Sequence, residues 1–241
     1  MLESFLASVL FFVLLVGLGG GWYLWRRRAL LSLFQVGKSK RLVIYLSRVE
    51  VVQGGSVGVG GVVRSFAGPT VTASEASAAT LLAGIFEYLI PGLESQPGIL
   101  KTLFTRDISV FVQPSPILVQ QIPQEVPIVT VGSPGYNCVS EWAQRQLNPK
   151  VAFSPNNNAL VTHTGRSLVD PATGMVQVLY DAHNDRRVFY VGGITEVGTQ
   201  AGLLYLALKW RDLKQNMGKQ RVFAGLVQLS NGQVRLTETI H

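Results

Sequence analysis

The chain has few of the residues that build redox and metal sites. Among its 241 residues it has one cysteine, Cys138, and three histidines, His163, His183 and His241. A single cysteine excludes a disulfide within the chain, and the histidines lack the spacing of metal ligands. The sequence therefore predicts no metal site, and Cys138 is expected to be a buried structural thiol.

Charged residues are also scarce, at 15% of the chain, although the net charge is +7. Residues 1–40 hold five basic residues and one acidic residue, whereas residues 41–241 hold 16 basic and 13 acidic residues. The net charge of residues 41–241 is therefore only +3. A dedicated nucleic-acid-binding domain would be more basic, so no long nucleic acid is expected as a partner.

One basic cluster remains near the C-terminus. It has two interpretations: the solvated end of a helix, or a contact with anionic lipid or a phosphate-bearing ligand. The first is favoured because such clusters are common on protein surfaces. The cluster consists of Lys209, Arg211, Lys214, Lys219 and Arg221.

A long apolar run near the N-terminus predicts a membrane anchor. Residues 5–25 carry no charge over 21 positions, and a helix of that length covers about 30 Å, the thickness of a bilayer core. No basic residue precedes the run and aromatic residues close it, which favours a retained span over a cleaved signal peptide. The prediction is a transmembrane helix with a basic flank over residues 1–28.

The basic flank also predicts an orientation. Positive residues beside a span stay in the cytoplasm, so the N-terminus is expected outside and the domain inside, as in a single-pass protein with the lipid bilayer as a partner. Gly17 and Gly21, four residues apart, would share one helix face and favour association of helices in a homo-oligomer. The expected contacts with the membrane surface are Trp22, Trp25, Arg26, Arg27 and Arg28.

The rest of the chain predicts an α/β fold. After a juxtamembrane linker over residues 29–40, residues 41–46 form a β-branched-rich run typical of a buried strand. A helix is expected from Thr72 or Ser74 to about Leu89, and another strand over residues 108–112.

Two segments share a strand–loop–helix plan, which builds parallel sheets. Residues 126–131 and 187–191 are the strands, and residues 139–147 and 200–215 the helices. The polar turns between these units predict an antiparallel meander at one edge of the sheet. Residues 221–240 predict a β-hairpin with a type I′ turn at Asn231-Gly232. The fold class expected for residues 41–241 is thus a Rossmann-like, mostly parallel sheet with antiparallel edge additions and a C-terminal hairpin.

The two loops that enter helices are the candidate ligand sites. Ligands bind beyond the carboxyl ends of parallel strands, where helix N-termini offer unpaired N–H groups and glycines admit a phosphate. The alternative is that these glycines only make tight turns and Thr199 only caps a helix. The predicted ligand residues are Gly132, Ser133, Asn137, Gly192, Gly193, Gly198 and Thr199.

Catalytic candidates are fewer. Glu75 near a helix start and Glu196 in a glycine-rich loop could each act as a base, or could each be a solvated or dipole-stabilising carboxylate. Ser133 lies in Gly-Ser-Pro-Gly, which is not a nucleophile-elbow sequence.

This organisation resembles the membrane-anchored nucleotide-sensing effectors of prokaryotic immunity that have CARF-type domains. The likeness rests on the run of residues 5–28 and on the loops 132–137 and 192–199. It implies a Rossmann-like domain that binds a nucleotide, such as a cyclic oligoadenylate, and passes a signal to its span as an oligomer. No cofactor is otherwise predicted.

Three functions are compatible with these features. The first is a tethered domain that senses a nucleotide-like ligand. The second is a nucleotide- or nucleoside-processing enzyme that uses Glu75 or Glu196. The third is a non-catalytic assembly subunit of a membrane complex in which the glycine loops are only turns.

Overall fold

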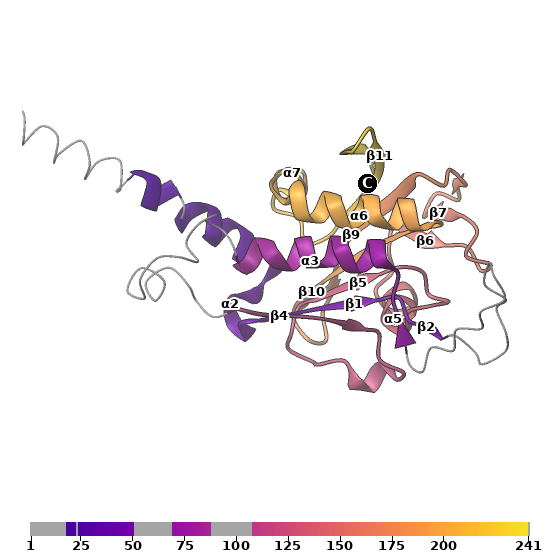
Figure 1. The fold of residues 1–241 in the computed structure, drawn as a ribbon, viewed down its shortest axis with the longest axis horizontal. Helices are drawn as coiled ribbons and strands as arrows, with labels where there is room; N and C mark the ends of the chain where they lie inside the picture. The colour runs from indigo at the N-terminus through magenta and orange to yellow at the C-terminus, as the bar shows by residue number, and fades with distance from the viewer. Residues whose placement is uncertain (1–17, 23, 51–68, 88–107, 241) are drawn as a thin grey trace, which may run out of the picture.

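Seven strands form one mixed sheet at the centre of the structure (Figure 1). The structure is a computed structural model, and it describes residues 18–22, 24–50, 69–87 and 108–240. The strand order is β12-β11-β9-β10-β5-β1-β4. These strands are β1 (Arg41–Leu46), β4 (Ser109–Pro114), β5 (Ile128–Val131), β9 (Thr173–Asp181), β10 (Arg186–Gly193), β11 (Phe223–Ser230) and β12 (Gln233–Thr239).

Two small sheets and several helices complete the described part. The small sheets pair β2 (Val49–Glu50) with β3 (Pro69–Thr70), and β6 (Val151–Phe153) with β7 (Leu160–Thr162) and β8 (Ser167–Leu168). The helices are α2 (Val36–Ser39), α3 (Ala73–Glu87), α5 (Cys138–Gln146), α6 (Glu196–Leu208) and α7 (Trp210–Met217), with the short 3₁₀ helix η2 (Val119–Gln121).

The sheet is buried on both faces, and β1 shows why its sequence is so apolar. Leu42, Ile44 and Leu46 face the cluster that includes α3, α6 and α7. Val43 and Tyr45 face the opposite cluster, which includes Val139 of α5. Side chains alternate along a strand, so a strand covered on both faces needs apolar residues at every position.

Only one half of the sheet is parallel, which corrects the expected mostly parallel sheet. Strands β4, β1, β5 and β10 pair in parallel. Strands β10, β9, β11 and β12 pair antiparallel, so three of the six pairings are antiparallel. The polar segment before β9 predicted a meander at the edge, but β9 lies inside the sheet. The β-type runs before it form the separate sheet β6-β7-β8.

Helices α3 and α6 lie side by side on one face of the sheet (Figure 1). Thr72 begins α3, since its Oγ1 accepts a hydrogen bond from the N–H of Glu75 at 3.3 Å, as expected from the sequence. Helix α5 lies on the other face, where Val139 and Ala143 are buried. The result is a three-layer α/β/α arrangement.

The N-terminal helix, described at residues 18–22 and 24–34, packs its last turns against the domain. Leu30, Leu33 and Phe34 are fully buried in the core, and the ring of Phe34 stacks on Phe189 with centroids 4.4 Å apart. Burying each such side chain stabilises a fold by about 1.5–3 kcal/mol. Part of the expected 29–40 linker thus contributes to the domain core.

The expected membrane span is corrected by this structure. Within the described ranges, no helix has the combined length and apolar character that crossing a membrane requires. Residues 1–17 of the predicted span, Gly17 among them, lie outside the described residues, while Trp22 and Trp25 are exposed. From Leu30 onward, the described helix buries its apolar side chains against the protein. The structure therefore does not support the predicted transmembrane helix as part of the fold. The predicted single-pass topology with a cytoplasmic domain depended on that helix and is not supported either.

The C-terminal hairpin has the expected turn. Asn231 and Gly232, between β11 and β12, both have positive φ, at 50° and 72°. This is the conformation of a type I′ turn, so the prediction from Asn-Gly is confirmed.

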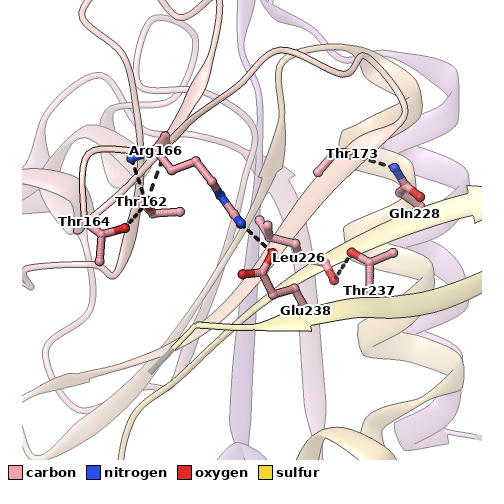
Figure 2. Close-up of polar contacts among 8 residues, drawn as sticks. All are labelled: Thr162, Thr164, Arg166, Thr173, Leu226, Gln228, Thr237 and Glu238. Atoms are coloured by element: carbon pink, nitrogen blue, oxygen red, sulfur yellow. Dashed lines mark hydrogen bonds and ion pairs between the residues drawn. The ribbon is translucent and has the colours of Figure 1, made fainter.

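Polar contacts tie this hairpin to neighbouring strands (Figure 2). Arg166, before β8, forms an ion pair with Glu238 of β12. Gln228 of β11 donates a hydrogen bond from Nε2 to Oγ1 of Thr173 in β9 at 3.1 Å. These contacts connect the hairpin to the three-stranded sheet and to β9.

A buried ion pair holds the turn between β9 and β10. Arg186 is 4% exposed, and its Nε donates to Oδ2 of Asp181 at 2.8 Å. Its Nη1 donates to the carbonyl oxygens of Pro123 and Val126. Burial would raise the pKa of Asp181, but hydrogen bonds from Asn184 and Arg186, together with the Arg186 charge, lower it below the ordinary value.

Replacing Arg186 by methionine should lower the free energy of unfolding at neutral pH by about 3–5 kcal/mol, because the Asp181 carboxylate would be buried without a partner. Urea unfolding monitored by circular dichroism measures the change. The double variant Arg186→Met/Asp181→Leu should recover much of the loss. Equal losses in the single and double variants would contradict this account.

Candidate functional site

The candidate site lies at the carboxyl edge of the parallel strands, between β1 and β5. After β1 the chain passes through α3, on one face of the sheet, and enters β4, which is the neighbour of β1 on the side away from β5. From β5 it runs through α5 on the other face toward β10, on the opposite side. Connections that leave in opposite directions open a crevice at the strand ends, which is where α/β sheets bind ligands.

Ser47 and Gly132, which follow β1 and β5, lie against each other at this edge. Gly132 has φ +91°, a conformation that L side chains rarely adopt. A Cβ atom placed there would lie 2.0 Å from the Ser47 Oγ and 3.6 Å from Oε1 of Glu75. Glycine is therefore required for the serine hydroxyl to occupy this position.

Glu75, in the first turn of α3, is buried beside this contact, with 5% of its surface exposed. The Ser47 Oγ donates to its Oε1 at 3.2 Å, whereas Oε2 has no hydrogen-bond partner among the described residues. Burial is the largest influence and raises the pKa of Glu75. Two hydrogen bonds from Ser47 oppose the shift, and the nearby Glu196 carboxylate adds to it.

The Ser47 hydroxyl lies between two acceptors but has one proton. Its Oγ is 3.2 Å from Glu75 Oε1 and 3.3 Å from the carbonyl oxygen of Val131. A carboxylate and a carbonyl cannot both be satisfied by that proton. If Glu75 is protonated, its own proton serves the Ser47 oxygen and the serine proton serves Val131, which agrees with the raised pKa.

Asn137 joins the strand ends to α5 and has no spare hydrogen-bonding capacity. It is 1% exposed, and its Nδ2 donates to the carbonyl oxygens of Tyr45 at 3.1 Å and Val131 at 2.8 Å. Its Oδ1 accepts from the N–H groups of Val139 and Ser140. The predicted ligand residue thus acts as an internal clamp and as the N-cap of α5.

A pocket of about 420 Å³ opens next to this clamp and is termed the carboxyl-edge pocket. Tyr136 on its rim is 59% exposed, and Ile117 is also exposed. The backbone N–H of Arg48 donates to the carbonyl oxygen of Tyr136 at 2.6 Å, which fixes the loop against the end of β1. The lining used below consists of Arg48, Ser115, Ile117, Tyr136, Cys138 and Glu141.

Cys138 lines the same pocket but is not placed as a nucleophile. Its Sγ donates to the carbonyl oxygen of Pro116 at 2.9 Å, and its backbone N–H donates to the Ser115 Oγ at 3.4 Å. Burial raises the pKa of the thiol, so the thiolate is disfavoured. The thiol is partly rather than fully buried.

The glycines of the second loop are closely packed against neighbouring protein atoms. A Cβ on Gly193 would lie 2.4 Å from the carbonyl carbon of Gly198, and one on Gly198 would lie 2.5 Å from the carbonyl oxygen of Thr173. A Cβ on Gly192 would lie 2.9 Å from the Phe153 ring. Gly193 and Gly198 therefore let α6 approach β9 and β10 closely, whereas Gly192 makes room for the Phe153 side chain of β6.

Thr199 belongs to the same packing. It is 3% exposed, and its hydroxyl lies within hydrogen-bonding distance of the carbonyl oxygens of Gly193 and Thr195. Thr195, not Thr199, is the N-cap of α6, since its Oγ1 accepts from the N–H of Gly198. The helix begins at Glu196, four residues earlier than the sequence pattern indicated.

The structure brings the two candidate acids to the same edge. Glu196 is exposed at the start of α6 and accepts a hydrogen bond from the Ser74 hydroxyl of α3. Glu75 follows Ser74, so the two carboxylates stand at adjacent helix starts. Ser133, the remaining predicted ligand residue, is half-buried directly after Gly132.

Sequence reasoning missed Ser47, Arg48 and Tyr136. A usable signal existed for the first two, because they directly follow the β1 strand and ligands bind beyond strand ends. Tyr136 lies in the predicted ligand loop 132–137, but no motif distinguishes it from its neighbours. For metals, no group of three or more His, Cys, Asp or Glu side chains able to hold an ion occurs in the part of the chain that the structure describes.

Comparisons with protein-family models, with curated proteins and with solved structures gave no match. The resemblance to CARF-type effectors therefore stays a prediction, and the function rests on the geometry of the site.

Replacing Gly132 by alanine should lower the free energy of unfolding by about 2–4 kcal/mol, from the strained φ and from the displaced Ser47 hydroxyl. The matched control is Gly165→Ala. Gly165 has a similar φ of +86° but nothing within 4 Å of an added Cβ, so it should lose only about 1 kcal/mol. Denaturant unfolding compares them, and equal losses would show that the Ser47 contact is unimportant.

The raised pKa of Glu75 predicts a pH dependence of stability. Its contribution is complete below the ordinary pKa of 4.5 and is lost as the pH rises through the higher pKa of the folded state. The melting temperature should therefore fall over this range in the wild-type chain but not in Glu75→Gln. Calorimetry at several pH values measures this, with Glu196→Gln as the control that keeps the decline. A parallel decline in Glu75→Gln would assign the titration to another group.

Proposed function

We propose that the domain binds a nucleotide-like ligand in the carboxyl-edge pocket. The observation that carries the proposal is the position of this pocket, at the point where the connections from β1 and β5 leave in opposite directions. Its volume of about 420 Å³ lies within the range of small-molecule sites.

The pocket lining suits a ligand with a flat ring and groups of both charges. Tyr136 offers an exposed aromatic face for stacking, and Ile117 adds apolar surface. Arg48 supplies a guanidinium for a phosphate, and Glu141 a carboxylate for a hydroxyl or an amine.

The start of α5 does not bind the phosphate in this proposal. Its first N–H groups already donate to Ser115 and Asn137. Recognition therefore depends on side chains of the pocket, Arg48 above all, and less on the helix N-terminus that the sequence suggested.

A second candidate, an enzyme acting on nucleotides, is favoured by Glu75. A buried carboxyl with a raised pKa and an unpartnered oxygen among the described residues is a candidate group to accept or donate a proton. Glu196 stands beside it, and Ser47 orients Oε1. In this alternative Glu75 transfers the proton and the carboxyl-edge pocket holds the substrate. A homo-oligomer and an assembly role stay predictions, with no site feature that favours them.

Binding is tested by thermal denaturation of the full-length chain with AMP, ATP or cyclic tetra-adenylate. At least one of these should raise the melting temperature, and calorimetric titration then gives its Kd. Tyr136→Ala should weaken that binding about 10-fold, because stacking contributes about 1–3 kcal/mol per base. Tyr136→Phe is the matched control, since it keeps the ring and should keep the affinity.

Chromatography of the nucleotide after incubation separates the two candidates. An unchanged nucleotide supports binding alone, whereas consumption that is lost in Glu75→Gln supports the enzyme. If no nucleotide changes the melting temperature and none is consumed, both are contradicted.

A further inference from the structure

The structure joins two basic segments that are far apart in the sequence. Between the N-terminal helix and α7 lies a pocket of about 710 Å³, termed the basic pocket. Trp25 and Arg28 line it from the helix, and Trp210, Arg211 and Lys214 from α7. The flank expected at a membrane and the C-terminal basic cluster thus meet on one surface.

Positive charge accumulates here without an acidic counterpart. Within the described residues, no ion pair joins Arg28, Arg211 or Lys214 to a carboxylate. Asp212, the acid of the first turn of α7, lines a different hollow with Tyr205. Burial, and second the charge of Arg211, lowers the pKa of Arg26, so cations of the two segments lie close enough to interact unfavourably. A bound anion would relieve this repulsion.

Two of the cations nearby already have a structural role. Lys214 Nζ donates to the carbonyl oxygen of Ala29 at 3.0 Å. Arg187 Nη1, from the start of β10, donates to the carbonyl oxygens of Ser32 and Leu33. These bonds satisfy carbonyls in the last turns of the N-terminal helix, where cations are favourable.

Arg28 and Arg211 are not used in this way. Both are exposed, and the guanidinium of Arg211 lies over the Trp210 ring, 5.2 Å from its centroid. Trp25, on the same pocket, is 68% exposed. The basic pocket thus offers two exposed guanidinium groups, of Arg28 and Arg211, and the exposed indole of Trp25. Guanidinium groups suit phosphate because they donate two hydrogen bonds in parallel.

We propose that the basic pocket is a binding site for a phosphate-bearing ligand, held by Arg28 and Arg211 and covered by Trp25. Arg187, at the amino-terminal end of β10, contacts the same helix. The basic pocket therefore lies at the opposite end of the parallel strands from the carboxyl-edge pocket, and the two sites are separate.

Calorimetric titration of the full-length chain with inorganic pyrophosphate tests the proposal. The wild-type chain should bind it, and Arg28→Glu/Arg211→Glu should weaken binding about 10-fold or more. Both residues are exposed, and an unchanged circular dichroism spectrum verifies the fold. The control Lys150→Glu/Arg235→Glu changes the net charge equally at other surfaces and should keep the affinity. Equal weakening in both variants would overturn the site.

A second titration, with glycerophosphoinositol, identifies the source of the phosphate. Binding of pyrophosphate alone indicates a free phosphate compound, and tighter binding of glycerophosphoinositol indicates a lipid headgroup. In either case the loss in Arg28→Glu/Arg211→Glu supports the proposal. Binding of neither probe by the wild-type chain overturns it. Tyr136→Ala should leave these titrations unchanged. The proposal for the carboxyl-edge pocket can therefore be contradicted without contradicting the proposal for the basic pocket.

Discussion

The contact between the Ser47 hydroxyl and Gly132 sets how closely the ends of β1 and β5 approach. Only glycine fits at position 132, because a Cβ would lie 2.0 Å from the serine oxygen. The same hydroxyl holds Glu75 and so fixes the start of α3 over the strand ends. Asn137 completes the arrangement by joining both strands to α5. The contacts of Ser47, Gly132 and Asn137 thus position two strands, two helices and the buried carboxyl group of Glu75.

This arrangement separates residues that hold the fold from residues that can meet a ligand. The side chains of Asn137 and Thr199 form hydrogen bonds within the protein. Gly193 and Gly198 lie in close contact with neighbouring backbone. Tyr136, by contrast, is exposed beside a pocket. At the other end of the parallel strands, Arg28 of the N-terminal helix and Arg211 of α7 form no ion pair with a carboxylate of the described residues. The carboxyl-edge pocket, with basic, acidic and apolar side chains, and the basic pocket therefore lie at opposite ends of the parallel strands.

The sequence predicted the elements well where a pattern is local. The β-branched run at residues 41–46 matches β1, and Asn231-Gly232 predicted the hairpin turn. Predictions that needed long-range packing were less successful. Nothing local places β9 between β10 and β11, or shows that glycines at 193 and 198 face backbone and not solvent. The apolar run of residues 5–25 was interpreted from its length, its lack of charge and its flanks, yet the helix described from residue 18 continues into the protein core at Leu30 and Phe34. Ser47 and Tyr136 carry no motif, because their importance arises from the meeting of segments about 90 positions apart.

Photo-labelling with 8-azido-ATP tests the central claim most directly, because it reports the location of a nucleotide and not only its affinity. After irradiation of the full-length chain, mass spectrometry of peptides identifies the labelled residues. The account predicts labelling between residues 132 and 146, centred on Tyr136, that excess unlabelled ATP removes. Competable labelling confined to residues 192–199, or no competable labelling at all, would contradict it.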